Sequence, residues 1–487
     1  MGWKDLRTFL AHLESQDQLV RYPDPVTPEP GLRAIGRAAA DMGHTGPAVI
    51  VDNVQGYGNA RIAMNVHGSW ANHALMLGMP KTATLKEQFH ELERRWDNYP
   101  GEVVFTEDAP CKENVVQGAE LNLLELLPLH KINEQDGGFY LSKASVVTAD
   151  PDQPEDLDTT NVGIYRLQVQ DRDTLAMQGL PFHDVAVHIR KSEERGEPLP
   201  VAICLGVEPM LSFMSSTPMA YDQSEYKFAA AVNGIPTELT RSGNGLPVPA
   251  GAEYVLEGEI LPRVRVPEGP FGEFPGSYSG TRNQVVIKIK QVTHRTDPIF
   301  ESLYLGRSWS EIDTLLGLNT CIPVYRQIKE TMPEVKAVNA LYQHGLTTII
   351  AMDSRLGGYA KSVAFRLFST PHGISYCKNC ILVDGDVDPF DLNQVMWAMS
   401  TRLRGSSDVM VIEPTPGMPL DPGSEPPGMG CKIILDCTTP VSPEPQLRDV
   451  MMVEPIPEAA AMQQQLTVLH QSLSGKGQAN TDATIQE

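Results

Sequence analysis

The chain has 487 residues, of which 41% are hydrophobic and 21% charged, a composition typical of globular proteins with a large buried core. Its 39 Lys and Arg against 61 Asp and Glu give a formal net charge of −22, which disfavours nucleic acid as a partner. No run of 18 apolar residues occurs, which excludes a transmembrane helix. The opening residues lack the features of a signal peptide and the seven cysteines are an odd number, so we expect reduced thiols and a cytoplasmic protein.

Helix and strand patterns alternate at the beginning of the chain. Apolar residues at helical spacing predict a helix over residues 3–14, and a second helix is expected after the Pro-rich stretch at 23–30. The segment PAVIVDNV at 47–54 predicts a strand, and residues 84–97 are dense in helix formers. We therefore expect a mixed α/β domain over residues 1–120.

The middle of the chain is predominantly β. The strand candidates are YLSKASVVTA, NVGIYRLQVQ, PVAICLGV, YVLEGEIL and NQVVIKIKQVTHR. In the last of these, Ile287 and Ile289 alternate with lysines, which predicts one buried face and one solvated face. The acidic segment 150–160 is expected to be a hairpin loop, and the β domain to span residues 121–317.

Strand and helix patterns alternate again in KAVNALYQ, LTTIIAMDS, KSVAFRLFS, NCILVDGD and NQVMWAMSTRL. This rhythm suggests βαβ-like units in a second α/β domain over residues 318–450. Residues 451–487 are expected to form a C-terminal helix, starting near Pro457, and a disordered tail. The apolar stripe of this helix could dock on its own subunit or on a neighbouring one.

Several familiar motifs are incomplete or absent. The segment DGDVD at Asp384 begins like a calcium loop, but Pro389 and Val395 stand where an EF-hand needs Gly and Glu. Cys377 and Cys380 have CxxC spacing but lead directly into an apolar strand and lack a second short pair for zinc. No P-loop, no GxGxxG after a strand and no GxSxG elbow occurs, so those nucleotide sites and that hydrolase chemistry are not indicated.

Two carboxylates flank a loop rich in Gly and Pro, in Glu268-Gly-Pro-Phe-Gly-Glu273. Glycine permits close approach of a ligand, and the apolar Phe274 that follows would raise a carboxyl pKa toward the range useful for proton transfer. The alternative is a surface turn with two solvated acids.

Arg166 lies in an otherwise apolar strand-like run, so its side chain must face solvent or pair with a carboxylate. Asn161, His183 and Glu225 form a plausible set of oxygen and nitrogen ligands for Mn²⁺ or Mg²⁺, although spacing alone does not establish it.

Five segments together resemble the UbiD family of decarboxylases. They are NVGIYR (161–166), SSTPMAYDQSEYKFAAA (215–231), EGPFGEFPGSYSG (268–280), FESLYLGRSWSEID (300–313) and ILVDGDVDPFDLNQVMWAMSTRL (381–403). The resemblance runs in order over roughly residues 1–445. It looks closest to the large subunit of the hydroxyarylic acid decarboxylases of vanillate and 4-hydroxybenzoate type.

The resemblance implies an N-terminal α/β domain, a split β-barrel that binds flavin, a C-terminal α/β oligomerisation domain and a C-terminal helix reaching toward a partner subunit. It also implies prenylated FMN, made by a separate UbiX-like flavin prenyltransferase, with Mn²⁺ and K⁺ at its phosphate, in a homodimer or homohexamer. The implied reaction is the reversible, non-oxidative decarboxylation of a small aromatic or heteroaromatic carboxylic acid through a covalent adduct with that cofactor.

Residue by residue, Arg166, Glu268 and Glu273 match the family's Glu–Arg–Glu network, with Glu273 as the proton donor. By the same resemblance, Asn161, His183 and Glu225 would hold the divalent metal. The further cofactor contacts would be Ile164, Tyr165, Arg166, Gln178, Gly179, Leu180, Ser215, Met219 and Lys361, with Ser215 and the backbone near Met214 and Thr217 where the family places K⁺ and phosphate.

The substrate is expected to contact Arg307, Ile312, Leu315 and His344. His344 could bond a phenolic hydroxyl or be a buried structural histidine. Arg307 could anchor a second anionic group, so a heteroaromatic acid such as furan-2,5-dicarboxylate or pyrrole-2-carboxylate competes with a hydroxybenzoate or vanillate.

Two other classes remain open, an oxidoreductase that uses ordinary FMN and a non-catalytic scaffold. The first would need a hydride-donor site and gives no reason for Glu268 and Glu273 to be paired with Arg166. An intact set of these three residues also argues against the second.

Overall fold

A computed structural model describes residues 2–58, 60–179, 183–306, 309–342, 344–445, 453, 456–459 and 461–469. The chain divides into two compact units, Met1–Thr439 and Pro440–Glu487. In the second unit residues 461–469 are helical, whereas the predicted tail at 476–487 lies outside the described residues. Over the described ranges, every helix is too short or too polar to cross a bilayer.

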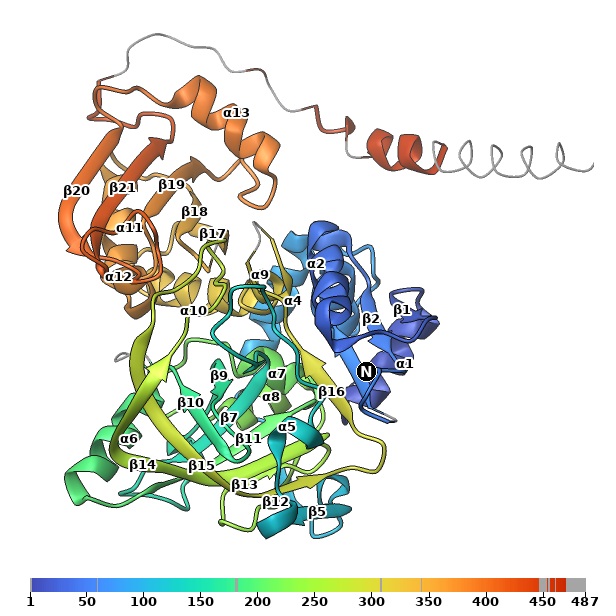
Figure 1. Cartoon of the computed structure of the whole chain (residues 1–487). Helices are drawn as coiled ribbons and strands as arrows, with labels where there is room; N and C mark the ends of the chain where they lie inside the picture. Colours follow the sequence, from blue (N-terminus) through green and yellow to red (C-terminus); the bar gives the residue numbers. More distant parts are fainter. Residues whose placement is uncertain are drawn as a thin grey trace, which may run out of the picture. The chain divides into compact units, whose positions relative to one another are not determined.

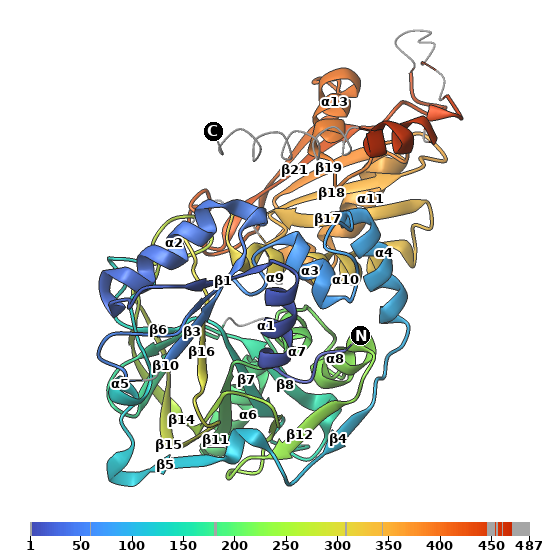
Figure 2. The ribbon, with the colours of Figure 1, turned by 90° about the vertical axis from the view of Figure 1, so that its right-hand side faces the viewer.

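A four-stranded mixed sheet forms the N-terminal part of the described chain. Its strands run in the order β1 (Leu19–Tyr22), β2 (Ala48–Val51), β3 (Arg61–Met64) and β16 (Ile299–Ser302). The helices of this part of the chain are α1 (Leu6–Ser15), α2 (Arg33–Asp41), α3 (Trp70–Met76) and α4 (Leu85–Trp96) (Figure 2). The predicted helix at 3–14, strand at 47–54 and helix at 84–97 are confirmed, and the apolar stripe of α1 is buried.

Nine strands within the described ranges form the central sheet, in which the long antiparallel pair β14–β15 dominates (Figure 1). Eight are neighbours in the order β6 (Tyr140–Leu141), β9 (Leu167–Val169), β10 (Thr174–Met177), β15 (Arg282–His294), β14 (Tyr254–Glu268), β11 (Leu199–Leu205), β7 (Ala144–Ala149) and β8 (Thr160–Ile164), and β5 (Asn114–Gln117) pairs with β15. Ile287 and Ile289 are buried while the lysines beside them are not, which confirms the predicted alternation. The acidic segment 150–160 connects the antiparallel strands β7 and β8, as expected.

The central sheet curves until its two ends approach each other. In the order of neighbouring strands, β8 is at one edge of the sheet and β9 is next to the strand at the other edge. Only Tyr165 and Arg166 separate β8 from β9 in the sequence. Since consecutive Cα atoms lie about 3.8 Å apart, these two strands must be close in space. The predicted continuous strand NVGIYRLQVQ is therefore broken at Tyr165–Arg166, where the backbone N–H of Ile164 donates to the carbonyl of Ser215 instead of extending the ladder.

Sheets cross the predicted domain boundaries. Strand β16 lies within the predicted β domain, yet it pairs in parallel with β3 of the predicted N-terminal domain. Strand β4 (Val103–Phe105) pairs with β12 (Thr237–Arg241), which also pairs with β13 (Pro247–Pro249). The boundaries at 120 and 317 stay a prediction from sequence.

The C-terminal sheet is mixed. Its strands run in the order β17 (Val335–Tyr342), β18 (Thr347–Met352), β19 (Asn379–Asp384), β21 (Met429–Cys437) and β20 (Val409–Pro416), with helices α10 (Leu318–Lys329), α11 (Tyr359–Phe368), α12 (Pro371–Ser375) and α13 (Leu392–Arg402). The expected βαβ unit is present between β18 and β19, which are parallel. The expectation of such a unit is wrong for β17 and β18, which are antiparallel. A tight turn through His344 and Gly345, both at positive φ, joins these two strands.

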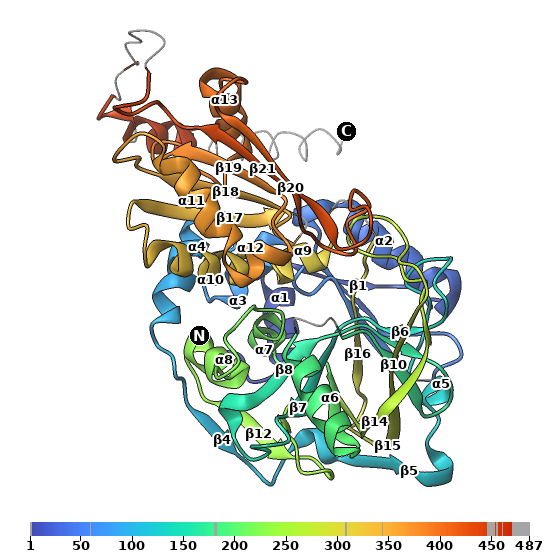
Figure 3. The ribbon, with the colours of Figure 1, turned by 90° about the vertical axis from the view of Figure 1, so that its left-hand side faces the viewer.

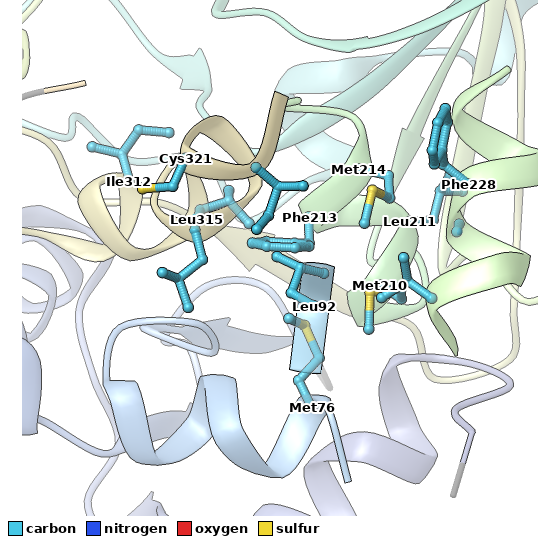
Figure 4. Close-up of a cluster of buried hydrophobic side chains, with 14 of the residues drawn as sticks. Met76, Leu92, Met210, Leu211, Phe213, Met214, Phe228, Ile312, Leu315 and Cys321 are labelled. Atoms are coloured by element: carbon cyan, nitrogen blue, oxygen red, sulfur yellow. The ribbon is translucent and has the colours of Figure 1, made fainter. Parts of the chain in front are cut away.

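Some of the helices pack between the sheets. The α-helices not yet named are α5 (Leu123–Leu126), α6 (Asp184–Arg195), α7 (Pro209–Met214), α8 (Glu225–Asn233) and α9 (Glu311–Leu315). Figures 1 and 3 show α9, α10 and α12 between the C-terminal sheet and the central sheet. In Figure 4, Phe213 of α7 lies with Leu92 of α4 and Leu315 of α9 in one buried cluster. Each such side chain contributes about 1.5–3 kcal/mol through burial, so α7 and α9 are held firmly where the site requires them.

A buried ionic cluster joins the N-terminal sheet, the central sheet and α9. The ammonium of Lys143 lies 2.5 Å from a carboxylate oxygen of both Glu301 and Glu311 and 2.9 Å from Nδ1 of His67. The backbone N–H of His67 also donates to Glu311. All four side chains are at most 2% exposed, so the cluster has little access to water.

Replacing Lys143 by Met should destabilise the protein strongly, because two carboxylates would stay buried without a cation. Loss of one partner of a buried pair costs about 3–5 kcal/mol. The matched control is Lys288→Met, since Lys288 pairs with Asp173 at the surface and such pairs contribute under about 1 kcal/mol. Urea unfolding followed by circular dichroism measures both variants, and equal small shifts would contradict a structural role for the cluster.

Candidate active site

A cavity of about 340 Å³ lies where the two ends of the central sheet meet the C-terminal part. Its wall combines residues 161–166, the segment 215–219 after α7, the loop after β14, α9, and residues His344, His372 and Tyr376. All of these belong to the first compact unit. The volume is within the usual range of small-molecule sites.

Arg166 lies between two glutamates at this cavity. Its Nη2 donates to Glu268 at 2.8 Å, and its Nη1 donates to Glu273. The break between β8 and β9 directs the guanidinium toward the end of β14, where Glu268 is the last residue of the strand and Glu273 follows after a turn. The predicted pairing of Arg166 with carboxylates is confirmed, and the surface-turn alternative is wrong because both glutamates are buried.

The two glutamates have different surroundings. Glu268 is fully buried and does not line the cavity, whereas Glu273 is part of its wall. Burial raises the pKa of Glu273 more than Arg166 lowers it. The pKa of Glu273 is therefore shifted in the direction that its apolar sequence setting predicts and that proton donation requires.

The turn between the glutamates depends on close backbone contacts. Gly269 has φ +96°, and a Cβ on Gly272 would come within 2.2 Å of the amide of Asn133. The carboxylate of Asp136 accepts the backbone N–H of Gly272 at 2.8 Å. These contacts fix the path by which the chain returns to place Glu273 beside Arg166.

The three predicted metal ligands all line the cavity, together with Asp184. Glu225 is at the start of α8, and Asn161 accepts a hydrogen bond from Tyr165 at 3.4 Å. Burial raises the pKa of Glu225 to about 8, and no cation of the described chain lowers it. A buried carboxylate beside an amide oxygen and an imidazole is a chemically suitable site for a hard divalent cation.

The structure brings most of the other predicted contact residues to the cavity. Ile164, Tyr165, Gln178, Ser215, Met219, Ile312 and His344 line it. Gly179, Leu315 and Lys361 are not among its lining residues, and Leu315 is instead part of the hydrophobic core. Lys361 lies on α11, where its charge acts on Asp436. Leu180 and Arg307 are outside the described residues.

Sequence reasoning missed an aromatic wall. Phe274 stacks on His344 with ring centroids 3.9 Å apart, and His372 stacks on Tyr376 at 4.8 Å. Phe271 lies under the guanidinium of Arg166, 5.2 Å from its centroid. His372 and Tyr376 are about a hundred residues from Glu273, and the local sequence carries no pattern that announces this contact.

Two of the histidines that line the cavity, His344 and His372, are uncharged near neutral pH. Burial lowers the pKa of His344 to about 3 and that of His372 to about 4. The Nε2 atom of each has no hydrogen-bond partner within the described chain. They present neutral imidazoles, which exchange hydrogen bonds with a hydroxyl more readily than they would pair with a second carboxylate.

Comparison with known proteins places the chain in a family. Models of 3-octaprenyl-4-hydroxybenzoate carboxy-lyase (UbiD) match its N-terminal domain to residues 10–92, its Rift-related domain to 102–308 and its C-terminal domain to 313–437. The phenolic acid decarboxylase of Sedimentibacter hydroxybenzoicus is 56% identical over 458 residues, which cover 93% of this chain and 95% of that protein.

Similarity to solved structures supports the same family. The vanillic acid decarboxylase of Sedimentibacter hydroxybenzoicus in closed form has 54% sequence identity and a TM-score of 0.90, covering 96% of this chain and 99% of that one. An evolved dimeric form of the UbiD-class enzyme HmfF from Pelotomaculum thermopropionicum, in complex with prFMN, has 27% identity and a TM-score of 0.78, covering 93% and 97%. The chain thus belongs to the UbiD family of carboxy-lyases and is a decarboxylase of that class.

Proposed function

We propose that the protein catalyses the reversible, non-oxidative decarboxylation of a phenolic acid of hydroxybenzoate or vanillate type. The observation that carries this proposal is Arg166 held between Glu268 and Glu273 at the wall of the cavity. The names of the similar proteins, phenolic acid decarboxylase and vanillic acid decarboxylase, support the same substrate class.

Prenylated FMN is the cofactor we propose for the cavity. The curved central sheet would serve as the split β-barrel, with Ile164, Tyr165, Gln178 and Met219 against the flavin. The buried Nε of Arg166 and Nδ2 of Asn161 have no partner within the described chain, so polar atoms of a ligand can satisfy them. When bound, the prenylated ring supplies the electrophilic carbon that takes up the electron pair left when CO₂ departs.

Metal ions would hold the phosphate end of the cofactor. Asn161, His183 and Glu225 are the ligands we propose for Mn²⁺, whose charge would compensate the buried carboxylate. The hydroxyls of Ser215 and Thr217, also in the wall, are oxygen donors suited to K⁺.

The chain's own residues position the substrate and move the proton. Arg166 holds the substrate carboxylate, since a guanidinium binds carboxylate in a fixed plane. After the C–C bond breaks, Glu273 donates its proton to the ring carbon that carried the carboxylate. Phe271 and Phe274 exclude water from this point, which preserves the strength of the ionic contacts.

The aromatic wall favours a phenolic monocarboxylate. Arg166 is the one Lys or Arg among the described lining residues, and it already faces two carboxylates. The neutral His344 would bond a phenolic hydroxyl at the far end of the ring. The dicarboxylate alternative would depend on Arg307, which lies outside the described residues.

We further propose that a UbiX-like prenyltransferase supplies the cofactor, that the chain forms a homodimer or homohexamer, and that residues 318–450 make that contact.

Replacing Glu273 by Gln should lower kcat on vanillate or 4-hydroxybenzoate by roughly 10²–10⁴-fold with little change in KM, because it removes the proton donor but keeps its shape. The measurement is CO₂ release by protein co-expressed with a UbiX-like prenyltransferase, with the flavin identified by intact mass and absorption spectrum. The exposed Glu120→Gln is the control. Plain FMN without decarboxylation would favour the oxidoreductase alternative.

Replacing His344 by Phe should lower kcat/KM for 4-hydroxybenzoate by roughly threefold to tenfold, because one hydrogen bond to the phenolic hydroxyl is lost. The kcat/KM for benzoate, which lacks that hydroxyl, should not fall to the same extent. Arg307→Leu is the companion variant, and a selective rise of KM for furan-2,5-dicarboxylate in it would support the dicarboxylate alternative instead.

Replacing Gly163 by Ala should weaken flavin binding, because a Cβ there would lie 2.5 Å from the ring of Tyr165 and would displace it from the cavity wall. Gly405→Ala is the control, since a Cβ there would meet no atom within 4 Å. Flavin content per chain after purification distinguishes the two, and equal retention would mean that Tyr165 does not define the binding surface.

A further inference from the structure

Glu268 accepts a second hydrogen bond from a tyrosine hydroxyl, whereas the second hydrogen bond to Glu273 is a long one from a backbone N–H. Oε2 of Glu268 receives Nη2 of Arg166 at 2.8 Å, and its Oε1 receives the hydroxyl of Tyr140 at 2.9 Å. Tyr140 is on β6, and both its side chain and that of Glu268 are almost completely buried behind the cavity wall. Each oxygen of Glu268 therefore has a strong donor.

Glu273 has a weaker set of donors on its second oxygen. Arg166 reaches Oε1, but Oε2 has only the backbone N–H of Phe274 at 3.4 Å. Both glutamates share the same guanidinium, so Arg166 cannot by itself distinguish them. The hydroxyl of Tyr140 is the contact that makes the pair unequal.

We propose that Tyr140 is a positioning residue that holds Glu268 as the hydrogen-bond acceptor of the Arg166 pair and thereby leaves the transferable proton on Glu273. This inference rests on the proposed function, because it concerns the same proton transfer. Tyr140 touches neither the cavity nor the reacting atoms, and it acts through Glu268 and Arg166.

The physical reason is competition for one proton. Two carboxylates that share a single cation in a buried site compete for a proton, and where that proton lies depends on the hydrogen bonds that each carboxylate accepts. A donor to the ionised form of Glu268 favours the microstate in which Glu273 is protonated. Burial and the charge of Glu268 keep the pKa of Tyr140 far above neutrality, so its hydroxyl remains a donor.

Other ionisable groups face this pair but do not provide the same distinction. Asp136 donates nothing to either glutamate and is engaged by the backbone N–H groups of Asn133 and Gly272. The charge of Glu273 acts on Tyr376, whose pKa burial raises to about 12, so that phenol stays neutral. The neutral His344 meets the loop by stacking on Phe274.

Tyr140→Phe isolates the hydroxyl from the packing. The ring of Tyr140 packs on Phe271 at 4.3 Å, and Phe271 in turn lies against Arg166. A phenylalanine keeps this stack and removes only the donor to Glu268.

In the loaded enzyme, Tyr140→Phe should lower kcat roughly tenfold with KM nearly unchanged, because the proton is then shared with Glu268. The alkaline limb of the kcat–pH profile should move to higher pH, since the pair binds its proton more tightly without that donor. Tyr359→Phe removes a similar tyrosine–glutamate bond, to Glu334, remote from the cavity, and should move neither quantity. An unmoved limb in Tyr140→Phe would overturn the proposal.

A second readout does not require activity. Infrared titration of the full chain, with and without flavin, can follow the carboxylic-acid band of each glutamate, assigned by its loss in Glu273→Gln or in Glu268→Gln. In Tyr140→Phe, the band of Glu273 should weaken and the band of Glu268 should grow. Fluorotyrosine at position 140, a stronger donor, should shift the alkaline limb the opposite way. If the wild type fails to decarboxylate but the bands shift, the proposed function fails and the role of Tyr140 stands; unchanged bands contradict Tyr140 alone.

Discussion

The site depends on one guanidinium shared by two buried carboxylates. Such an arrangement is costly unless every partner is held in place, because an unpaired charge in a dry site is strongly destabilising. The protein holds Arg166 in the gap between the two ends of the central sheet, where it has left the β-ladder. It holds Glu268 at the end of β14 and returns Glu273 through a turn that only glycine permits. The arrangement of charged groups at the site therefore depends on the curvature of the sheet.

The C-terminal part completes this site with uncharged groups. His344 is at the left-handed turn between β17 and β18, and the stacked pair of His372 and Tyr376 is on or beside α12. Because burial keeps both imidazoles neutral, they add hydrogen-bonding atoms without competing with Arg166 for a carboxylate. These uncharged groups lie beside the loop that carries Glu273, since His344 stacks on Phe274 and the charge of Glu273 acts on Tyr376.

Features encoded within one segment could be predicted from sequence. The alternation around Ile287, the amphipathic first helix and the need of Arg166 for a carboxylate partner each follow from local pattern and burial. Contacts between distant segments could not. Tyr140 meets Glu268 across 128 residues, β16 joins a sheet formed by the first strands, and Lys361 lies away from the cavity although a motif suggested otherwise. No periodicity in one segment specifies which buried polar group of another it will meet.

In the described part of the chain, Lys143 and Arg166 each pair with two buried glutamates, and the two clusters differ in their access to the cavity. Around Lys143, burial by itself would raise the pKa of Glu311, but the ammonium and His67 lower it to about 2. That cluster does not line the cavity; Glu311 stays anionic there, and the cluster holds three elements together. Around Arg166, one carboxylate faces the cavity with few donors, and burial raises its pKa instead. The proton-donor role that we propose for Glu273 depends on this difference, since Glu273 has fewer hydrogen-bond donors than Glu268 and lies at the cavity wall.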